Sequence, residues 1–134
     1  MKKLLLLLIS FGFLIAPSVK AEIVLYCQSE LETGFFKENG SWKVSEFHPQ
    51  RLTIKFNDDY TKLDGLAGFY PMSCSKPYTI DPDYIACVHS KGSHETFTYN
   101  KLTKRFLYSH TKVDGYVDNG YDTNFLRAGT CEAF

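Results

Sequence analysis

Turn-forming residues punctuate this chain about every ten residues, so the segments between them have room only for short strands. Asn-Gly and Asp-Gly pairs favour tight hairpins because their backbones readily adopt positive φ. The intervening segments are rich in aromatic side chains, with 11 Phe, 9 Tyr and 1 Trp in 134 residues. The pattern predicts an antiparallel β meander. Its turn segments are Asn39-Gly40, Asn57-Asp58-Asp59, Lys91-Gly92, Asn100 to Thr103, Asp114-Gly115 and Asn119-Gly120.

We therefore expect an all-β fold of eight or nine strands. A small antiparallel barrel or a strongly curved sheet would accommodate them, and barrel closure would remove the exposed edges of the sheet. A two-sheet sandwich is the alternative. The strands are expected near residues 22–28, 33–38, 41–47, 51–57, 60–66, 84–90, 94–99, 104–111 and 124–131.

The first 21 residues have the three-part pattern of a cleavable secretory signal peptide. Lys2 and Lys3 precede an apolar run from Leu4 to Ile15, and Val19-Lys20-Ala21 supplies small residues at the expected cleavage site. A membrane anchor is the alternative, but a span needs about 20 apolar residues and this run is shorter. We expect cleavage after residue 21, a single domain over 22–134, and a secreted or periplasmic location.

The charge of the expected mature protein argues against nucleic acid as a partner. Three of the 15 basic residues lie in the signal, so 12 basic residues face 15 acidic ones and the net charge is −3. Phosphate binding requires clustered Lys and Arg, and no such stripe is present in the sequence. No later apolar stretch is long enough to span a membrane.

All four cysteines fall within the expected mature domain. An even number of cysteines in a short exported protein predicts two disulfides, for which three pairings are possible. We favour Cys27–Cys131, which ties the two ends of the domain, and Cys74–Cys87, which pins a central loop to the next strand. A zinc site is the alternative, but the sequence has no Cys-x-x-Cys pair.

Hairpin register indicates which residues share a face. With Asn39-Gly40 as a two-residue turn, Phe35 opposes Val44 and Lys37 opposes Trp42. Phe35, Trp42 and Val44 then lie on one face of the hairpin. In residues 52–56 the apolar side chains alternate with polar ones, which indicates a half-buried strand whose apolar face Leu63 can join.

A second set of hairpins is expected over residues 84–110. With Lys91-Gly92 as one turn and residues 100–103 as the next loop, we expect an aromatic face to form the core. Cys87 then points away from that core, beneath a strap formed by loop 67–80. A one-residue slip at Gly92 would alter this assignment. The register opposes His89 to His94, Cys87 to Thr96 and Phe97 to Phe106, and the core face carries Tyr84, Ala86, Val88, Phe97, Tyr99, Phe106, Tyr108 and His110.

No motif in the sequence indicates catalysis, so we expect the protein not to be an enzyme and to need no cofactor. The sequence has no Gly-x-Ser-x-Gly elbow, and oxidised cysteines are not nucleophiles. His89 and His94 form a weak candidate metal pair, because opposed hairpin residues have Cβ atoms about 5 Å apart. Two exposed polar residues beside a turn are the alternative reading of this pair.

Two loops are candidate interaction surfaces. Residues 67–82 carry apolar and aromatic side chains, and residues 112–123 combine tyrosine with glycine and acidic residues. Tyrosine offers contact area at low entropic cost. Core packing and solvated turns are the alternative interpretations. The residues proposed for contact are Phe69, Tyr70, Met72, Tyr116 and Tyr121.

Two short resemblances accompany these observations. Gly40-Ser41-Trp42 with a late Arg127 is similar to the Gly-x-Trp motif and C-terminal arginine of lipocalins, which implies a ligand-carrying barrel. The layout of Tyr26-Cys27, residues 67–70, Lys91-Gly92 and Cys131 resembles that of periplasmic inhibitors of c-type lysozyme. The sequence lacks the Ser-Gly-x-x-Tyr signature of those inhibitors and has two further cysteines.

Together these features predict an exported, non-enzymatic binding or interaction module. Its partner could be a protein, a glycan or a small ligand. The alternatives are an inhibitor of an extracytoplasmic hydrolase and a small-ligand carrier with an apolar barrel interior.

Overall fold

The computed structural model describes residues 21–66, 71–89, 94–111 and 123–133. Every regular element in these ranges is a β-strand, and all strand pairs are antiparallel. The strands are β1 (Ile23–Glu38), β2 (Ser41–Glu46), β3 (Arg51–Phe56), β4 (Lys62–Asp64), β5 (Met72–Ser75), β6 (Tyr84–His89), β7 (His94–Asn100), β8 (Arg105–Thr111) and β9 (Asn124–Ala133).

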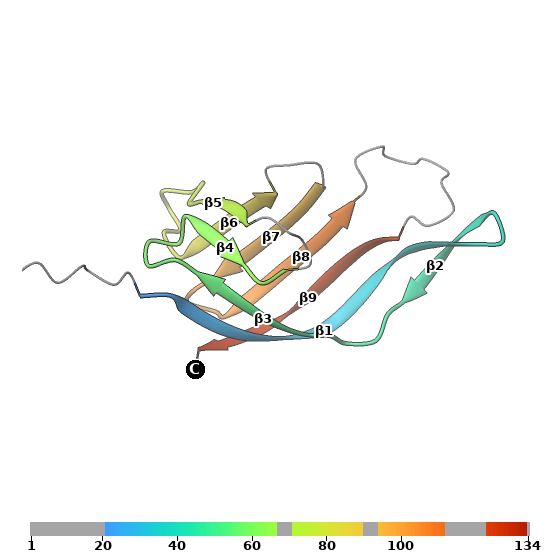
Figure 1. Ribbon diagram of the computed structural model, residues 1–134, viewed down its shortest axis with the longest axis horizontal. Helices are drawn as coiled ribbons and strands as arrows, with labels where there is room; N and C mark the ends of the chain where they lie inside the picture. The colour runs from blue at the N-terminus through green and yellow to red at the C-terminus, as the bar shows by residue number, and fades with distance from the viewer. Residues whose placement is uncertain (1–20, 67–70, 90–93, 112–122, 134) are drawn as a thin grey trace, which may run out of the picture.

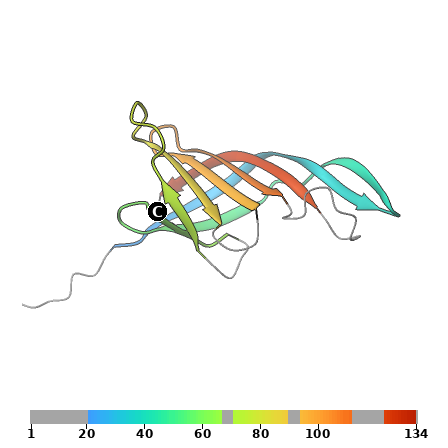
Figure 2. The ribbon, with the colours of Figure 1, turned by 90° about the horizontal axis from the view of Figure 1, so that it is seen from above.

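The sheet closes because β1 pairs with β9 as well as with β3, and this gives an eight-stranded barrel with β2 as an extra strand. The predicted all-β barrel is therefore confirmed. The first half of β1 pairs with β3 and its second half with β2, so β1 and β2 form a hairpin that extends beyond the barrel (Figures 1 and 2). This hairpin and the end of β9 lie toward opposite ends of the molecule (Figure 1).

Both predicted disulfides are present, Cys27–Cys131 and Cys74–Cys87. Each joins residues that lie directly opposite one another in neighbouring strands. Cys27–Cys131 links the first strand to the last, at the seam where the barrel closes. Two disulfides are consistent with folding in an oxidising, extracellular compartment.

The barrel interior is filled by its own side chains, most of them large and apolar. Rings stack across the core, with centroids 5.5 Å apart for Phe97 and Phe106 and 6.0 Å apart for Phe56 and Tyr99. The buried apolar residues are Leu25, Cys27, Ile54, Phe56, Leu63, Met72, Ile85, Cys87, Phe97, Tyr99, Phe106, Tyr108 and Cys131. The predicted inward turn of the aromatic residues on β7 and β8 is confirmed, as is the place of Leu63 beside Phe56.

The predicted register of the β1–β2 hairpin is confirmed: Phe35 opposes Val44 and Lys37 opposes Trp42. Asn39 and Gly40 both have positive φ, at 51° and 80°, as the two-residue turn requires. The expected break between residues 28 and 33 is wrong, because β1 runs through this segment as one strand.

The predicted register of β6 against β7 is wrong by one residue. Cys87 opposes Phe97, not Thr96, so the inward face of β6 carries Ile85 and Cys87. Val88, placed in the core by the sequence reading, is 53% exposed. Tyr84 and Ala86, also placed in the core, are only partly buried.

Two further expectations fail in the same part of the barrel. Residues 72–75 do not strap the outside: they form β5, a barrel strand that places Cys74 beside Cys87. The pairing of β7 with β8 differs from the expected one by two residues, because Tyr99 and not Phe97 opposes Phe106. A two-residue shift preserves the alternation of faces, so these aromatic residues still point inward.

Candidate functional site

One irregularity in β1 decides which side chains face outward at the seam of the barrel. The register of β1 against β9 shifts between Ser29 and Leu31, so β1 contains a β-bulge. Before the bulge, Cys27 and Ser29 are buried; after it, Glu32 is buried while Leu31 points outward. The extra residue therefore exchanges the two faces of β1.

Hydrogen bonds and close backbone packing hold this bulge in place. The Ser29 amide donates to the Gln50 carbonyl at 2.9 Å, and the Gln50 amide donates to Ser29 Oγ at 2.5 Å. On the opposite strand, a Cβ added to Gly129 would lie 2.0 Å from the Gln28 carbonyl oxygen. Only glycine permits β9 to approach β1 so closely here.

The bulge turns Leu31 and Phe35 of β1 outward. There they join exposed apolar side chains of β2, β8 and β9 in a group that we call the outer apolar face. It consists of Leu31, Phe35, Val44, Leu107 and Leu126, each between 46% and 73% exposed. The strand registers make these residues neighbours. Leu31 and Leu107 both flank Ala128, while Phe35 opposes Val44.

Two open hollows lie along this face. One, of about 410 Å³, is lined by Phe35, Val44, Leu126 and neighbouring side chains of β8 and β9. The other, of about 470 Å³, lies between Leu31, Leu126 and segment 46–49. Apolar side chains exposed together in this way are typical of a contact surface for another molecule.

Inside the barrel, the same exchange of faces buries a charged pair. Glu32 Oε1 lies 2.7 Å from Arg127 Nε, and the side chains of Glu32 and Arg127 are 1% and 18% exposed. The Nε–H bond does not point at the carboxylate, so the contact is an ion pair rather than a directed hydrogen bond. Glu32, Arg127 and Tyr108 occupy one cross-strand row over β1, β9 and β8.

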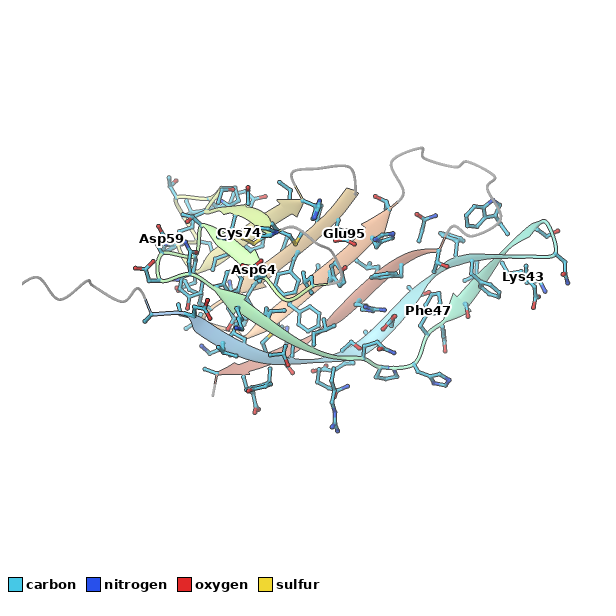
Figure 3. All side chains as sticks on the ribbon, viewed as in Figure 1. Lys43, Phe47, Asp59, Asp64, Cys74 and Glu95 are labelled. Carbon is cyan, nitrogen blue, oxygen red and sulfur yellow. A yellow bond between two sulfur atoms is a disulfide. The ribbon has the colours of Figure 1, made fainter. Side chains whose placement is uncertain are left out.

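The next row holds a carboxylate–histidine pair. His110 Nδ1 lies 2.8 Å from Glu95 Oε1, and the His110 ring stacks on Phe125 with centroids 5.4 Å apart. The Arg127 guanidinium lies 4.0 Å from the centre of the same Phe125 ring. Glu95, labelled in Figure 3, is buried at 4% exposure. These contacts link three neighbouring strands, β7, β8 and β9, and fix the orientation of His110.

The Glu32–Arg127 and Glu95–His110 pairs, with the Phe125 ring between them, give structural support to the outer apolar face. The Glu32–Arg127 pair joins β1 to β9 just beside the bulge, so it holds in place the backbone that presents Leu31 and Leu126. A histidine oriented by a carboxylate could also transfer protons. Among the described residues, no group of three or more His, Cys, Asp or Glu side chains could hold a metal ion.

Tyr108 shares this interior and is 1% exposed. Burial raises the pKa of the Tyr108 hydroxyl well above its ordinary value of 10, and the nearby Glu95 carboxylate raises it further, against a smaller lowering by Arg127. Burial also raises the pKa of Tyr99, with Tyr60 as the smaller cause. Both hydroxyls therefore stay protonated in the folded protein after tyrosines in the unfolded state have ionised.

This difference predicts a loss of stability in alkali. Above a pH of about 10, the unfolded state releases these protons while the folded barrel retains them, so stability falls by about 1.4 kcal/mol per pH unit for each retained proton. Urea unfolding at successive pH values measures the slope. Tyr108→Phe removes one of the two protons and should flatten the decline. An equal slope in native protein and variant would contradict the assignment to Tyr108.

Of the predicted contact residues, only Met72 lies in the described ranges. Met72 is 2% exposed in the core, so its proposed place on an interaction surface is wrong: it faces inward from β5. Phe69, Tyr70, Tyr116 and Tyr121 lie outside the described residues.

The predicted metal pair does not form a cross-strand pair. Because Val88 opposes Thr96, continuing the register by one residue places Glu95, and not His94, opposite His89. His94 is paired with Thr111 on β8.

Sequence reasoning missed the residues that make up both faces of the seam. Leu31, Leu107 and Leu126 were not singled out, and neither were the Glu32–Arg127 and Glu95–His110 pairs. In β9, counting back in twos from the buried Cys131 places Arg127 inward and Leu126 outward, so the predicted Cys27–Cys131 disulfide was a signal for these two residues. For β1 the sequence pattern did not show that Leu31 faces outward and Glu32 inward, because the bulge is not visible in it.

No family model, curated protein or solved structure matches this protein. Among the described residues, no helix is long and apolar enough to cross a membrane.

Proposed function

We propose that the protein is an exported, non-enzymatic binding module that docks a protein partner on its outer apolar face. The observation that carries this proposal is the contiguity of Leu31, Phe35, Val44, Leu107 and Leu126, all large and exposed on neighbouring strands. A polar outer surface would cost the barrel nothing, so a clustered apolar one favours a role in contact.

A protein partner fits this surface better than the other partners considered. The exposed groups are apolar, and the fully buried centre of a protein–protein interface is more apolar than the rest of a protein surface. The hollows over the face are open, as suits the side chains of a protein. The packed interior supports the binding module over a small-ligand carrier, since Phe56, Phe97 and Tyr99 fill it at 0–2% exposure.

The test is affinity capture from extracellular or envelope extract of the source organism, read by mass spectrometry. The variant Leu31→Ser/Val44→Ser/Leu126→Ser should lose at least tenfold of the captured partner, because each buried anchor contributes about 1–2 kcal/mol. The matched control is Ile80→Ser/Val88→Ser/Leu102→Ser, which removes three exposed apolar side chains elsewhere and should retain it.

Equal capture by both triple variants would refute docking on this face. If the captured protein is a hydrolase, the inhibitor alternative is tested with the same variants. The native protein and the control should then inhibit the hydrolase, while the outer-face variant should not.

A further inference from the structure

The free edge of β2 is a second surface with its own chemistry. Among the described residues β2 pairs only with β1, so β2 is an edge strand and no other described strand lies along its second edge. The hairpin that carries it projects from the barrel, where Lys43 is labelled in Figure 3. The last residue of β1 that pairs with β9 is Phe35, so beyond it the described hairpin has only two strands.

Two-stranded ribbons are marginal in water, and a third strand stabilises them. An exposed edge is also a template for such a strand. We propose that the third strand is β2 of a second copy of this protein, which forms a two-fold symmetric dimer with a continuous sheet across both hairpins. This dimer does not depend on the partner proposed above.

Symmetry and charge select one register for this pairing. Neighbouring antiparallel strands related by a two-fold axis place one residue opposite its own copy. Only two registers pair five of the six residues of β2: one centred on Lys43 and one centred on Val44. The first opposes two lysine side chains, which is destabilising. The second opposes Val44 to Val44.

The neighbours in the Val44-centred register are compatible. Trp42 of one copy lies opposite Glu46 of the other, and Lys43 lies opposite Ser45, so no like charges meet. Lys43 also forms an ion pair with Glu38 on the same hairpin. Lys43 therefore discourages the wrong register without preventing the right one.

The dimer also extends the outer apolar face. Phe35 and Val44 lie opposite each other on that face, and a two-fold axis perpendicular to the sheet keeps the same face outward in both copies. The row then reads Phe35, Val44, Val44, Phe35, at strand spacings of about 4.8 Å. Val44, which is 73% exposed in the single protomer, gains an apolar neighbour on its open side.

The experiment is sedimentation velocity of the oxidised mature protein over a range of concentrations, with two variants at the axis. Val44→Lys and Val44→Glu each oppose like charges and should weaken self-association at least tenfold. An equimolar mixture of the two variants should restore the dimer as a heterodimer, because opposite charges then meet at the axis. Val88→Lys, at another exposed valine, should associate like the native protein.

A native protein that stays monomeric up to near-millimolar concentration overturns the proposal. So does a mixture of the two charge variants that does not form heterodimers, or a Val44→Lys variant that dimerises like the native protein. Circular dichroism confirms that each variant is folded. A monomeric protein that still captures its partner through Leu31 and Leu126 would leave the proposed function standing, so the two failures are distinguishable.

Discussion

Replacing Cys27 and Cys131 together by alanine is expected to lower the free energy of unfolding by about 4–5 kcal/mol. The disulfide links residues 104 positions apart, and a cross-link that closes a loop of about 100 residues restricts the unfolded state by about 4.7 kcal/mol. The total stability of a domain is typically about 5–15 kcal/mol, so the variant should lose a large share of it. Urea unfolding of the mature protein measures the difference.

The second disulfide supplies the matched control. Cys74 and Cys87 are 13 positions apart, and a loop of about 15 residues restricts the unfolded state by about 3 kcal/mol. The double alanine variant at this pair should therefore be the more stable of the two. Equal losses, or a larger loss at Cys74–Cys87, would show that loop closure does not govern the effect of the disulfide at the barrel seam.

Much of the barrel could be predicted because short-range signals are strong where a turn fixes the register. Asn39-Gly40 leaves two residues between its strands, and this alone places Phe35 opposite Val44. Alternation in residues 52–56 identified Ile54 and Phe56 as core residues, and both are fully buried.

The β6–β7 hairpin shows where such signals fail. Val88 opposes Thr96, a register that needs an odd number of connecting residues, whereas Lys91-Gly92 as a two-residue turn implies an even number. The strand itself could not settle the matter, because Ile85 and Cys87 on one face and Ala86 and Val88 on the other are all apolar.

The bulge in β1 could not be predicted at all. One extra residue between Ser29 and Leu31 leaves no mark in composition or periodicity, yet it decides that Leu31 and Phe35 face outward and Glu32 inward. The β1 part of the candidate site follows from this exchange, so a correct fold class did not lead to Leu31 or to the buried Glu32.

The buried Glu32–Arg127 pair offers the sharpest test of that exchange of faces. Arg127→Leu is expected to lower the free energy of unfolding by about 3–5 kcal/mol, because it leaves the Glu32 carboxylate buried without its counter-charge. The Glu32 side chain is 1% exposed, so water cannot replace the lost guanidinium without opening the barrel. Urea unfolding near neutral pH measures the loss.

Two controls separate the buried charge from the loss of arginine packing. Glu32→Gln added to Arg127→Leu removes the uncompensated charge and should recover most of the stability, since a neutral amide is far less costly to bury than a carboxylate. Lys55→Leu breaks the Lys55–Glu22 ion pair, whose side chains are 50% and 63% exposed, and should change stability by less than about 1 kcal/mol. An Arg127→Leu variant as stable as Lys55→Leu would mean that Glu32 reaches solvent. The inward side of the bulge, and with it the outward placement of Leu31, would then be wrong.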